Sequence, residues 1–227
     1  MYPKLNESKK KVLEEIISEK QNFYFIDGPG GSRKTFVYKT LIHYFTMKEK
    51  NITSMAWTGI ASILLPQGKT THKTFRWPLD IRNLETSILN EESDKKRLRE
   101  IDVIIWDKAS MIPKKALEIV DKTLQDVCIN NLKFGGKLVI LGGDFRQIAP
   151  VVKSGSKEDI ILETIKYSQY WPLFKILKLT KNMRSISNEF SSMLLDIGNG
   201  NINTWKIPKE WKVDDVCKDI NNKLLTQ

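Results

Sequence analysis

The sequence predicts an α/β fold in which a parallel sheet is flanked by helices. Short apolar runs that suit buried strands alternate along the chain with stretches whose apolar residues recur at helical spacing. A glycine-rich segment joins the first apolar run to the helical stretch that follows it. This order of strand, turn and helix aims the amino end of a helix at an anion, so we expect the fold to bind one.

The expected elements follow this alternation. A first helix is expected at about residues 7–19, where one face carries Val12, Leu13, Ile16 and Ile17. Strands are expected at residues 22–27, 51–57, 102–107 and 137–141. Further helices are expected at residues 34–48, 91–100 and 113–127, the second of them solvated and dense in charge. Parallel strands separated by helices gather their carboxyl ends at one edge, where ligands bind.

The composition is that of a basic globular protein. Its 227 residues suffice for one large domain or two small ones, and its formal net charge is +10. This charge favours a polyanionic partner, although many basic proteins bind no nucleic acid. No stretch resembles a membrane span or a signal peptide, and Cys128 and Cys217 lack metal-ligand spacing. We therefore expect an intracellular protein that is neither secreted nor bound to a membrane.

The glycine-rich segment, residues 28–35, fits the phosphate-loop pattern G-x-x-x-x-G-K-[ST] except that Arg33 replaces a glycine. In such a loop backbone N–H groups surround the phosphates, the lysine reaches the β- and γ-phosphates, and the Thr35 hydroxyl binds Mg²⁺. The expected ATP-binding residues are Gly28, Gly30, Gly31, Ser32, Arg33, Lys34 and Thr35. Arg33 adds bulk where the backbone must approach phosphate, although its charge suits phosphate. The alternative is a glycine-rich turn with an incidental Lys-Thr pair.

Residues 103–107 form an apolar strand that ends in Asp107, the pattern of a Walker B element that holds Mg²⁺ directly or through water. The next residue is Lys108, where an ATPase normally needs a carboxylate to deprotonate the attacking water. An ammonium there repels the metal and accepts no proton at its ordinary pKa. Alternatively, Lys108 points away into solvent and another group is the base.

A third polar segment, residues 142–147, follows the last expected strand. Its Asp144 and Gln147 would lie beside the nucleotide strand and sense the γ-phosphate or its water. The alternative is a Gly-Gly turn followed by a helix-capping aspartate.

In unbroken order over nearly the whole chain, these motifs resemble the first RecA-like domain of the PIF-type DNA helicases of superfamily 1, in particular the Helitron-like branch. The matching segments are residues 5–7, 25–31, 34–35, 58–61, 71–72, 75, 78–81, 104–107, 109–111, 141–147, 179–180 and 182–184. The resemblance implies a P-loop NTPase fold and an ATP-dependent DNA helicase that uses ATP, Mg²⁺ and single-stranded DNA. It also implies a role in DNA repair, recombination, telomere maintenance or transposon replication.

The resemblance assigns roles to individual residues. The implied catalytic residues are Lys34, Asp107, Gln147 and Arg184, with Thr35 and Asp107 at the metal. Arg184 would approach the γ-phosphate, and Gln147 would couple nucleotide to DNA. The expected DNA contacts are Thr58, Lys69, His72 and Phe75. The alternative for the stretch around Phe75 is a surface loop whose aromatic side chains turn into the core.

The chain departs from the family pattern at Lys9, Arg33 and Lys108, where the family has an adenine-binding glutamine, a glycine and a carboxylate. Each change adds a positive charge near the expected ATP site, so we expect hydrolysis to be deficient. A site that still holds ATP weakly is an equal alternative, because cations attract triphosphate even while they hinder Mg²⁺.

The resemblance predicts a RecA-like domain at residues 1–185 and a helical or irregular extension at 186–227, the start of a truncated remainder. Unwinding needs a second RecA-like domain that closes on the nucleotide, which a partner or a downstream segment would have to supply. We therefore expect a nuclear or mitochondrial member of the helicase family that is deficient in hydrolysis and unwinding. The alternatives are a non-catalytic basic nucleic-acid-binding module and a nucleotide-binding switch.

Overall fold

The computed structural model describes residues 6–147, 149–152 and 154–180, together with positions 192, 195, 196 and 199. The chain divides into two compact units, Met1–Ser187 and Asn188–Gln227, and the continuous described ranges all belong to the first. Arg184 and nearly all of the predicted extension lie outside the described residues. The predicted domain boundary after residue 185 therefore stays a prediction.

A six-stranded parallel sheet forms the centre of the first unit. Its strands lie in the order β3-β2-β4-β5-β1-β6, and every pair of neighbours is parallel. They are β1 (Phe23–Asp27), β2 (Ile52–Ala56), β3 (Lys69–Thr70), β4 (Val103–Asp107), β5 (Leu138–Gly143) and β6 (Lys175–Lys178). The predicted α/β class is confirmed, and the predicted strands correspond to β1, β2, β4 and β5.

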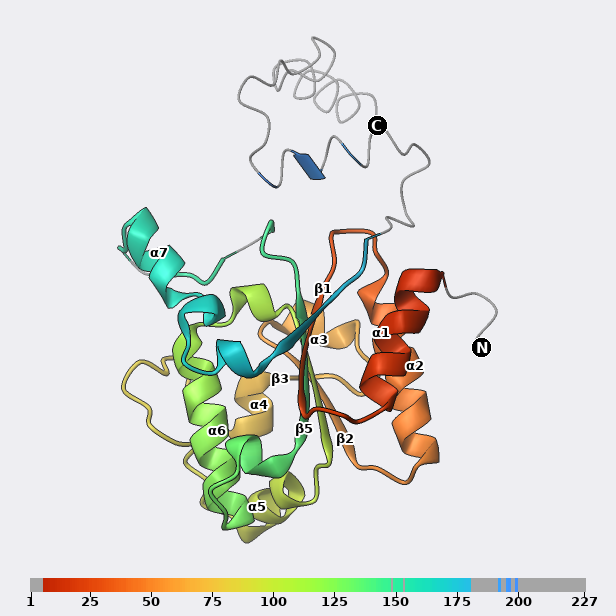
Figure 1. Ribbon diagram of the computed structural model, residues 1–227. Coiled ribbons are helices and arrows are strands. Elements are labelled where there is room, and N and C mark those ends of the chain that lie inside the picture. Colours follow the sequence, from red (N-terminus) through yellow and green to blue (C-terminus); the bar gives the residue numbers. More distant parts are fainter. Residues whose placement is uncertain are drawn as a thin grey trace, which may run out of the picture. The chain divides into compact units, whose positions relative to one another are not determined.

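Helices cover both faces of this sheet. In Figure 1, α1 and α2 lie on one side, and α4, α5 and α6 lie on the other. The helices are α1 (Glu7–Ile17), α2 (Lys34–Met47), α3 (Gly59–Ile63), α4 (Thr71–Phe75), α5 (Glu92–Arg99), α6 (Lys114–Cys128) and α7 (Lys157–Glu163). Short 3₁₀ helices occur at Ala109–Met111, Lys133–Gly136, Ile165–Tyr167 and Trp171–Leu173. No helix in the described part of the chain is both long and apolar enough to cross a membrane.

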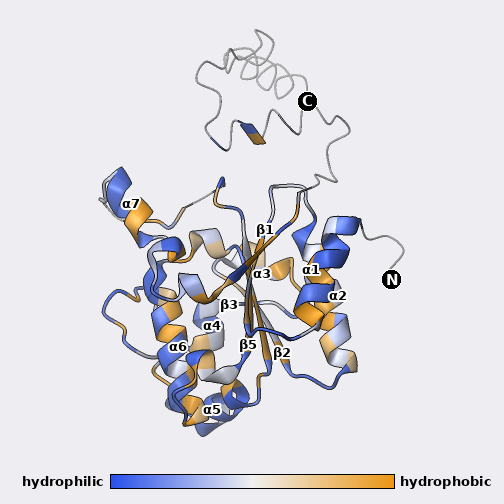
Figure 2. Cartoon of the chain, in the orientation of Figure 1, coloured by the Kyte–Doolittle hydropathy of each residue, from blue (hydrophilic) through white to orange (hydrophobic). Residues whose placement is uncertain are grey.

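Alternate residues of the central strands face two separate apolar cores. In β4, Ile104 and Trp106 belong to the core that includes residues of α5 and α6. Val103 and Ile105 belong to the core that includes residues of α1 and α2. Figure 2 shows hydrophobic residues along the central strands and mainly hydrophilic residues on α5. Packing on both faces fixes the positions of the strand ends, from which the site is built.

Besides the short elements β3, α3 and α4, two further elements were not predicted from the sequence, β6 and α7. Both end residues of β6 are exposed lysines, so the strand lacks a continuous apolar run and exists because it pairs with β1. The helix α7 begins with a capping box in which the Ser156 hydroxyl accepts the Asp159 N–H at 3.2 Å. In return, the Asp159 carboxylate accepts the Ser156 N–H at 2.8 Å. Neither element has the long apolar periodicity on which sequence-based assignment depends.

Candidate functional site

The glycine-rich segment connects β1 to α2 at the carboxyl edge of the sheet, as predicted. Gly28 donates its N–H to Gly143 O at 3.3 Å, which ties the start of the loop to the end of β5. The Lys34 ammonium folds back across the loop and donates to Gly28 O. Burial lowers the pKa of Lys34, while the charges of Asp107 and Asp144 oppose that change. The lysine therefore lies over the loop with both carboxylates nearby.

The Ser32 hydroxyl lies buried inside the loop without a hydrogen-bond partner among the described residues. An unpaired buried hydroxyl is costly, so this group suits an anion that accepts its proton in a hydrogen bond. A Cβ at Gly28 would stand only 2.6 Å from Ser32 Oγ. Glycine at position 28 is therefore needed for this close approach, and the loop fits a phosphate.

Arg33 directly precedes α2 and has a left-handed backbone, with φ 60° and ψ 47°. A residue with a Cβ costs about 1 to 2 kcal/mol in this conformation, whereas glycine adopts it freely. The backbone thus confirms that this position favours glycine. The Arg33 side chain is exposed.

Lys9, the second departure from the family pattern, lies beside the beginning of α2. Its residue surface is 3% exposed, and its ammonium is 5.8 Å from the centre of the Phe36 ring. Burial and the charge of Arg33 both lower the pKa of Lys9. Two of the predicted departures are therefore close enough to repel each other at the amino end of α2.

Asp107 ends β4 with 5% of its surface exposed and accepts a hydrogen bond from the Tyr38 hydroxyl at 2.9 Å. Burial, followed by the charge of Asp107, raises the pKa of Tyr38 well above its ordinary value, so the phenol stays a donor. Sequence reasoning missed Tyr38, although it lies three residues after Thr35 on the same helix. Thr35, the second residue of α2, and Asp107 carry oxygen atoms of the kind that Mg²⁺ prefers, and their joint role at the metal stays a prediction.

Lys108 points into the site. Its ammonium donates to Gln147 Oε1 at 3.0 Å in an exposed hydrogen bond, so Lys108 does not point away from the site, while the alternative that another group is the base stays a prediction. Gln147 Nε2 donates to Asp144 Oδ2 at 3.0 Å, and the same oxygen accepts the Gly30 N–H at 3.1 Å. These three hydrogen bonds join the phosphate loop, the residue after Asp107 and the segment after β5, which the sequence analysis expected to meet.

Asp144 is 4% exposed and also accepts a hydrogen bond from Arg146 Nε at 2.6 Å. Burial alone would raise the pKa of Asp144, but the hydrogen bonds from Arg146 outweigh it and the pKa is lowered. Arg146 also bonds Asp27 through Nη2 at 3.2 Å. The sequence analysis assigned Arg146 no role of its own, because its position between two aspartates depends on the pairing of β1 with β5.

Three of the residues predicted to contact DNA differ in how exposed they are. Lys69 is exposed, whereas Thr58 and His72 are half-buried. The Thr58 hydroxyl accepts the Ala61 N–H at 3.3 Å and so caps α3, which is a structural role. Burial lowers the pKa of His72, which favours the neutral imidazole.

The prediction that Phe75 contacts DNA is corrected by the structure. Its side chain is completely buried and stacks on Trp77, with ring centres 5.5 Å apart. Apolar burial holds it in the core, as in the alternative stated above. Trp57, which the sequence analysis did not select, is half-buried with its ring 4.8 Å from that of His72.

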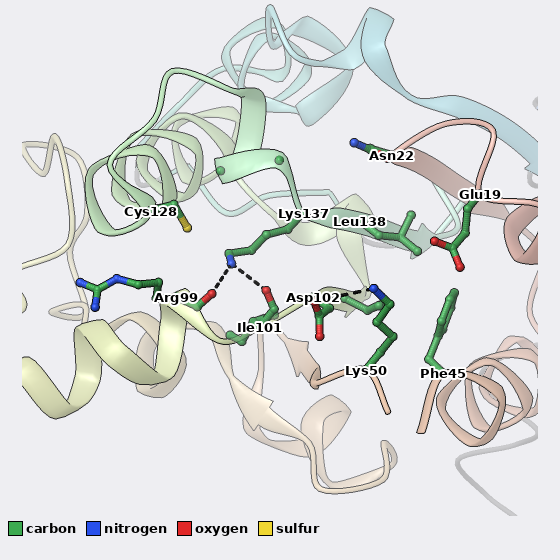
Figure 3. A pocket seen from close by; sticks show the side chains of 13 residues that line it. Glu19, Asn22, Phe45, Lys50, Arg99, Ile101, Asp102, Cys128, Lys137 and Leu138 are labelled. Carbon is green, nitrogen blue, oxygen red and sulfur yellow. Dashed lines mark hydrogen bonds and ion pairs between the residues drawn. The ribbon is translucent and has the colours of Figure 1, made fainter. Parts of the chain in front are cut away.

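A polar cavity of about 390 Å³ lies at the opposite, amino-terminal edge of the central strands (Figure 3). Lys137 is 6% exposed and donates to Arg99 O at 2.9 Å and Ile101 O at 2.6 Å. Asp102 accepts the Asn51 N–H at 2.8 Å. These charged side chains hydrogen-bond to backbone groups near the ends of helices and strands. We therefore assign the residues that line the cavity a structural role.

Comparison with known proteins decides the family. Residues 4–207 match the PIF1-like helicase family. The chain belongs to this family. The family predicted from the sequence motifs is therefore confirmed.

Curated relatives include ATP-dependent DNA helicases. The Pif1 helicase of Bdellovibrio bacteriovorus is 31% identical over 183 residues, covering 78% of this chain and 40% of the relative. The RRM3 helicase of Saccharomyces cerevisiae is 25% identical over 96% of this chain and 29% of the relative. This chain thus spans well under half the length of both relatives.

Solved Pif1 structures share the fold. Bacteroides Pif1 bound to ssDNA superimposes with a TM-score of 0.74 and 30% identity, over 88% of this chain and 47% of that one. The Bacteroides complex with ADP-AlF3 and ssDNA gives a TM-score of 0.75 and 26% identity, over 98% of this chain and 57% of that one. These similarities confirm the P-loop fold of the described unit.

Proposed function

We propose that this chain binds ATP and single-stranded DNA as the first RecA-like domain of a PIF1-like helicase, and that it hydrolyses ATP poorly. The phosphate loop, with its unpaired Ser32 hydroxyl and its overlying Lys34, supports nucleotide binding. Thr35 and Asp107 would hold Mg²⁺, which neutralises phosphate charge when bound. The helicase names of the relatives and the ssDNA and ADP-AlF3 in the Bacteroides complexes support the choice of ligands.

The position of the Lys108 ammonium carries the proposal of poor hydrolysis. The ammonium lies 3.0 Å from Gln147 Oε1, and Lys108 directly follows the aspartate that ends β4. A group that activates water must accept a proton, and an ammonium has no free lone pair. The Lys108 charge also opposes the approach of a divalent cation to Asp107. The chain therefore keeps groups that bind phosphate and lacks the expected base.

The deciding experiment measures ATP turnover with and without single-stranded DNA. We expect no DNA-stimulated turnover by the natural chain. The double variant Arg33→Gly with Lys108→Glu is expected to bind ATP with Mg²⁺ more tightly, because it restores a flexible loop and a carboxylate near the metal.

The variant Lys34→Ala supplies the control for contaminating ATPases. DNA-stimulated turnover by the natural chain that Lys34→Ala abolishes would overturn the proposed deficiency. Unchanged ATP affinity in the double variant would count against this account of the site.

The second candidate is a basic nucleic-acid-binding module that ignores nucleotide. The net charge of +10 and the exposed Lys69 and Lys73 favour it. In that case DNA affinity should fall steeply with salt and should not respond to ATP. A weak salt dependence, or a clear effect of ATP on DNA affinity, excludes this candidate.

A second RecA-like domain, from a partner or a downstream segment, would be needed for unwinding. That requirement, the Helitron-like branch and the nuclear or mitochondrial location stay predictions. Mixing the chain with a separately expressed second domain of a Pif1 relative, and measuring strand separation, would test the first of them.

A further inference from the structure

A carboxylate of the protein accepts a hydrogen bond from the backbone of the phosphate loop. The Gly30 N–H, one of the backbone donors of the loop, donates to Asp144 Oδ2 at 3.1 Å. A carboxylate and a phosphate make the same demand on such a donor, since both present negatively charged oxygens. The Gly30 N–H can donate its hydrogen bond to only one of these two groups at a time. Asp144 and a nucleotide phosphate therefore compete for Gly30.

Gln147 fixes Asp144 in that position. Its Nε2 donates to the same carboxylate oxygen at 3.0 Å, and it lies directly over the loop. A Cβ added to Gly30 would stand 3.4 Å from that nitrogen. The amide thus covers the backbone of the loop at the residue whose N–H is already engaged.

Lys108 determines which way the Gln147 amide points. An ammonium only donates hydrogen bonds, and an ionised carboxylate only accepts them. The amide oxygen must therefore face Lys108, at 3.0 Å, and the amide nitrogen must face Asp144. A carboxylate at position 108 would instead attract the amide nitrogen and remove the hydrogen bond that holds Asp144.

We propose that Lys108, Gln147 and Asp144 form a latch in which Asp144 acts as an internal ligand of the phosphate loop that the nucleotide must displace. Lys108 is a positioning residue in this latch and acts on the loop only through Gln147. The inference rests on the proposed nucleotide site and adds a second effect of Lys108, on nucleotide affinity, to its effect on hydrolysis.

The test compares the affinity of the full chain for ADP without metal, by titration calorimetry. Lys108→Met alters a half-buried side chain, and Gln147→Ala alters an exposed one. Each is expected to tighten ADP binding roughly 3- to 10-fold, the equivalent of one net hydrogen bond. The double variant should gain no more than either single variant, because both break the same chain of contacts.

The sign of the effect separates the latch from simple electrostatics. Removing a cation should weaken the binding of an anion, so charge alone predicts weaker ADP binding by Lys108→Met. Lys39→Met, at an exposed lysine of α2, is the matched control and should not tighten binding. The Gly30 amide resonance of the ligand-free chain should also move in Gln147→Ala.

Unchanged or weaker ADP binding by either latch variant overturns the proposal, and so does the absence of measurable ADP binding by all chains. DNA-stimulated ATP turnover by the natural chain would contradict the proposed deficiency in hydrolysis, and the ADP titrations would still decide on the latch. The two proposals therefore fail on different measurements.

Discussion

The charged side chains at the two edges of the sheet bond to different kinds of partner. At the amino edge, Lys137 bonds to two backbone carbonyl oxygens, and Asp102 accepts a backbone N–H. At the carboxyl edge, the bonds from Lys108 to Gln147 and from Gln147 to Asp144 run between side chains. Lys137 and Asp144 are similarly buried, at 6% and 4% exposed. Burial alone therefore does not identify a binding site.

The largest expected effect concerns ligand binding at the carboxyl edge. Lys34→Ala should weaken the binding of ATP by about 3 kcal/mol, roughly 100-fold, because a charged donor to phosphate is lost. The free energy of unfolding should change little, because the ammonium has only one hydrogen-bond acceptor among the described residues, Gly28 O. Calorimetric titration and urea denaturation measure the two quantities. An unchanged affinity would remove the phosphate loop from the proposed site.

The second effect concerns stability at the amino edge. Lys137→Met should lower the free energy of unfolding by about 2 to 3 kcal/mol, because two buried carbonyl oxygens lose their charged donor. Binding of ATP should be unchanged. Lys122→Met, at an exposed lysine of α6, is the control and should change stability by less than about 0.5 kcal/mol. A loss of nucleotide binding in Lys137→Met without a loss of stability would contradict the structural assignment of the cavity.

Gly135 at the amino edge and Arg33 at the carboxyl edge both have a left-handed backbone. Gly135 at the amino edge has φ +64°, and a Cβ there would stand 2.9 Å from Leu124 O and 3.0 Å from Cys128 Sγ. Gly135→Ala should therefore destabilise the protein by about 1 to 2 kcal/mol, through backbone strain and crowding. Thermal unfolding is a sufficient measurement. A neutral result would mean that this turn relaxes easily.

The smallest expected effect has the opposite sign. Arg33→Gly should stabilise the protein by about 0.5 kcal/mol, because the relief of left-handed strain exceeds the extra flexibility of glycine in the unfolded chain. Denaturant unfolding of the natural chain and the variant in parallel measures this difference. A destabilised variant would show that the exposed Arg33 side chain makes contacts that compensate for its backbone.

Local pattern predicted most of the fold and the outline of the site. The phosphate loop and the strand that ends in Asp107 were predicted because each is a short motif of adjacent residues. Long-range pairing was harder to predict: β6 is recognisable only beside β1, and Arg146 lies between Asp27 and Asp144 only because β1 and β5 are neighbours.

Side-chain direction was the other limit on prediction. Phe75 was expected at the DNA and is in the core, because a five-residue helix offers too little periodicity to separate its faces. The contact of Lys108 with Gln147 joins residues 39 positions apart, and no local pattern indicates it. Arg33 shows the opposite case, because the glycine pattern of the loop by itself marked this position as one that favours glycine, and its backbone is left-handed.

The pairing of β1 also has a consequence for how the chain folds as it is synthesised. This strand, Phe23–Asp27, finds its two neighbours only at Leu138–Gly143 and Lys175–Lys178. An emerging chain therefore presents an apolar segment whose two partner strands are missing until more than a hundred further residues have left the ribosome. Pairing between such distant segments is slow, and the unpaired segment favours aggregation or chaperone binding. A chain interrupted before β5 lacks the strand that pairs with β1 and accepts the Gly28 N–H at the start of the phosphate loop.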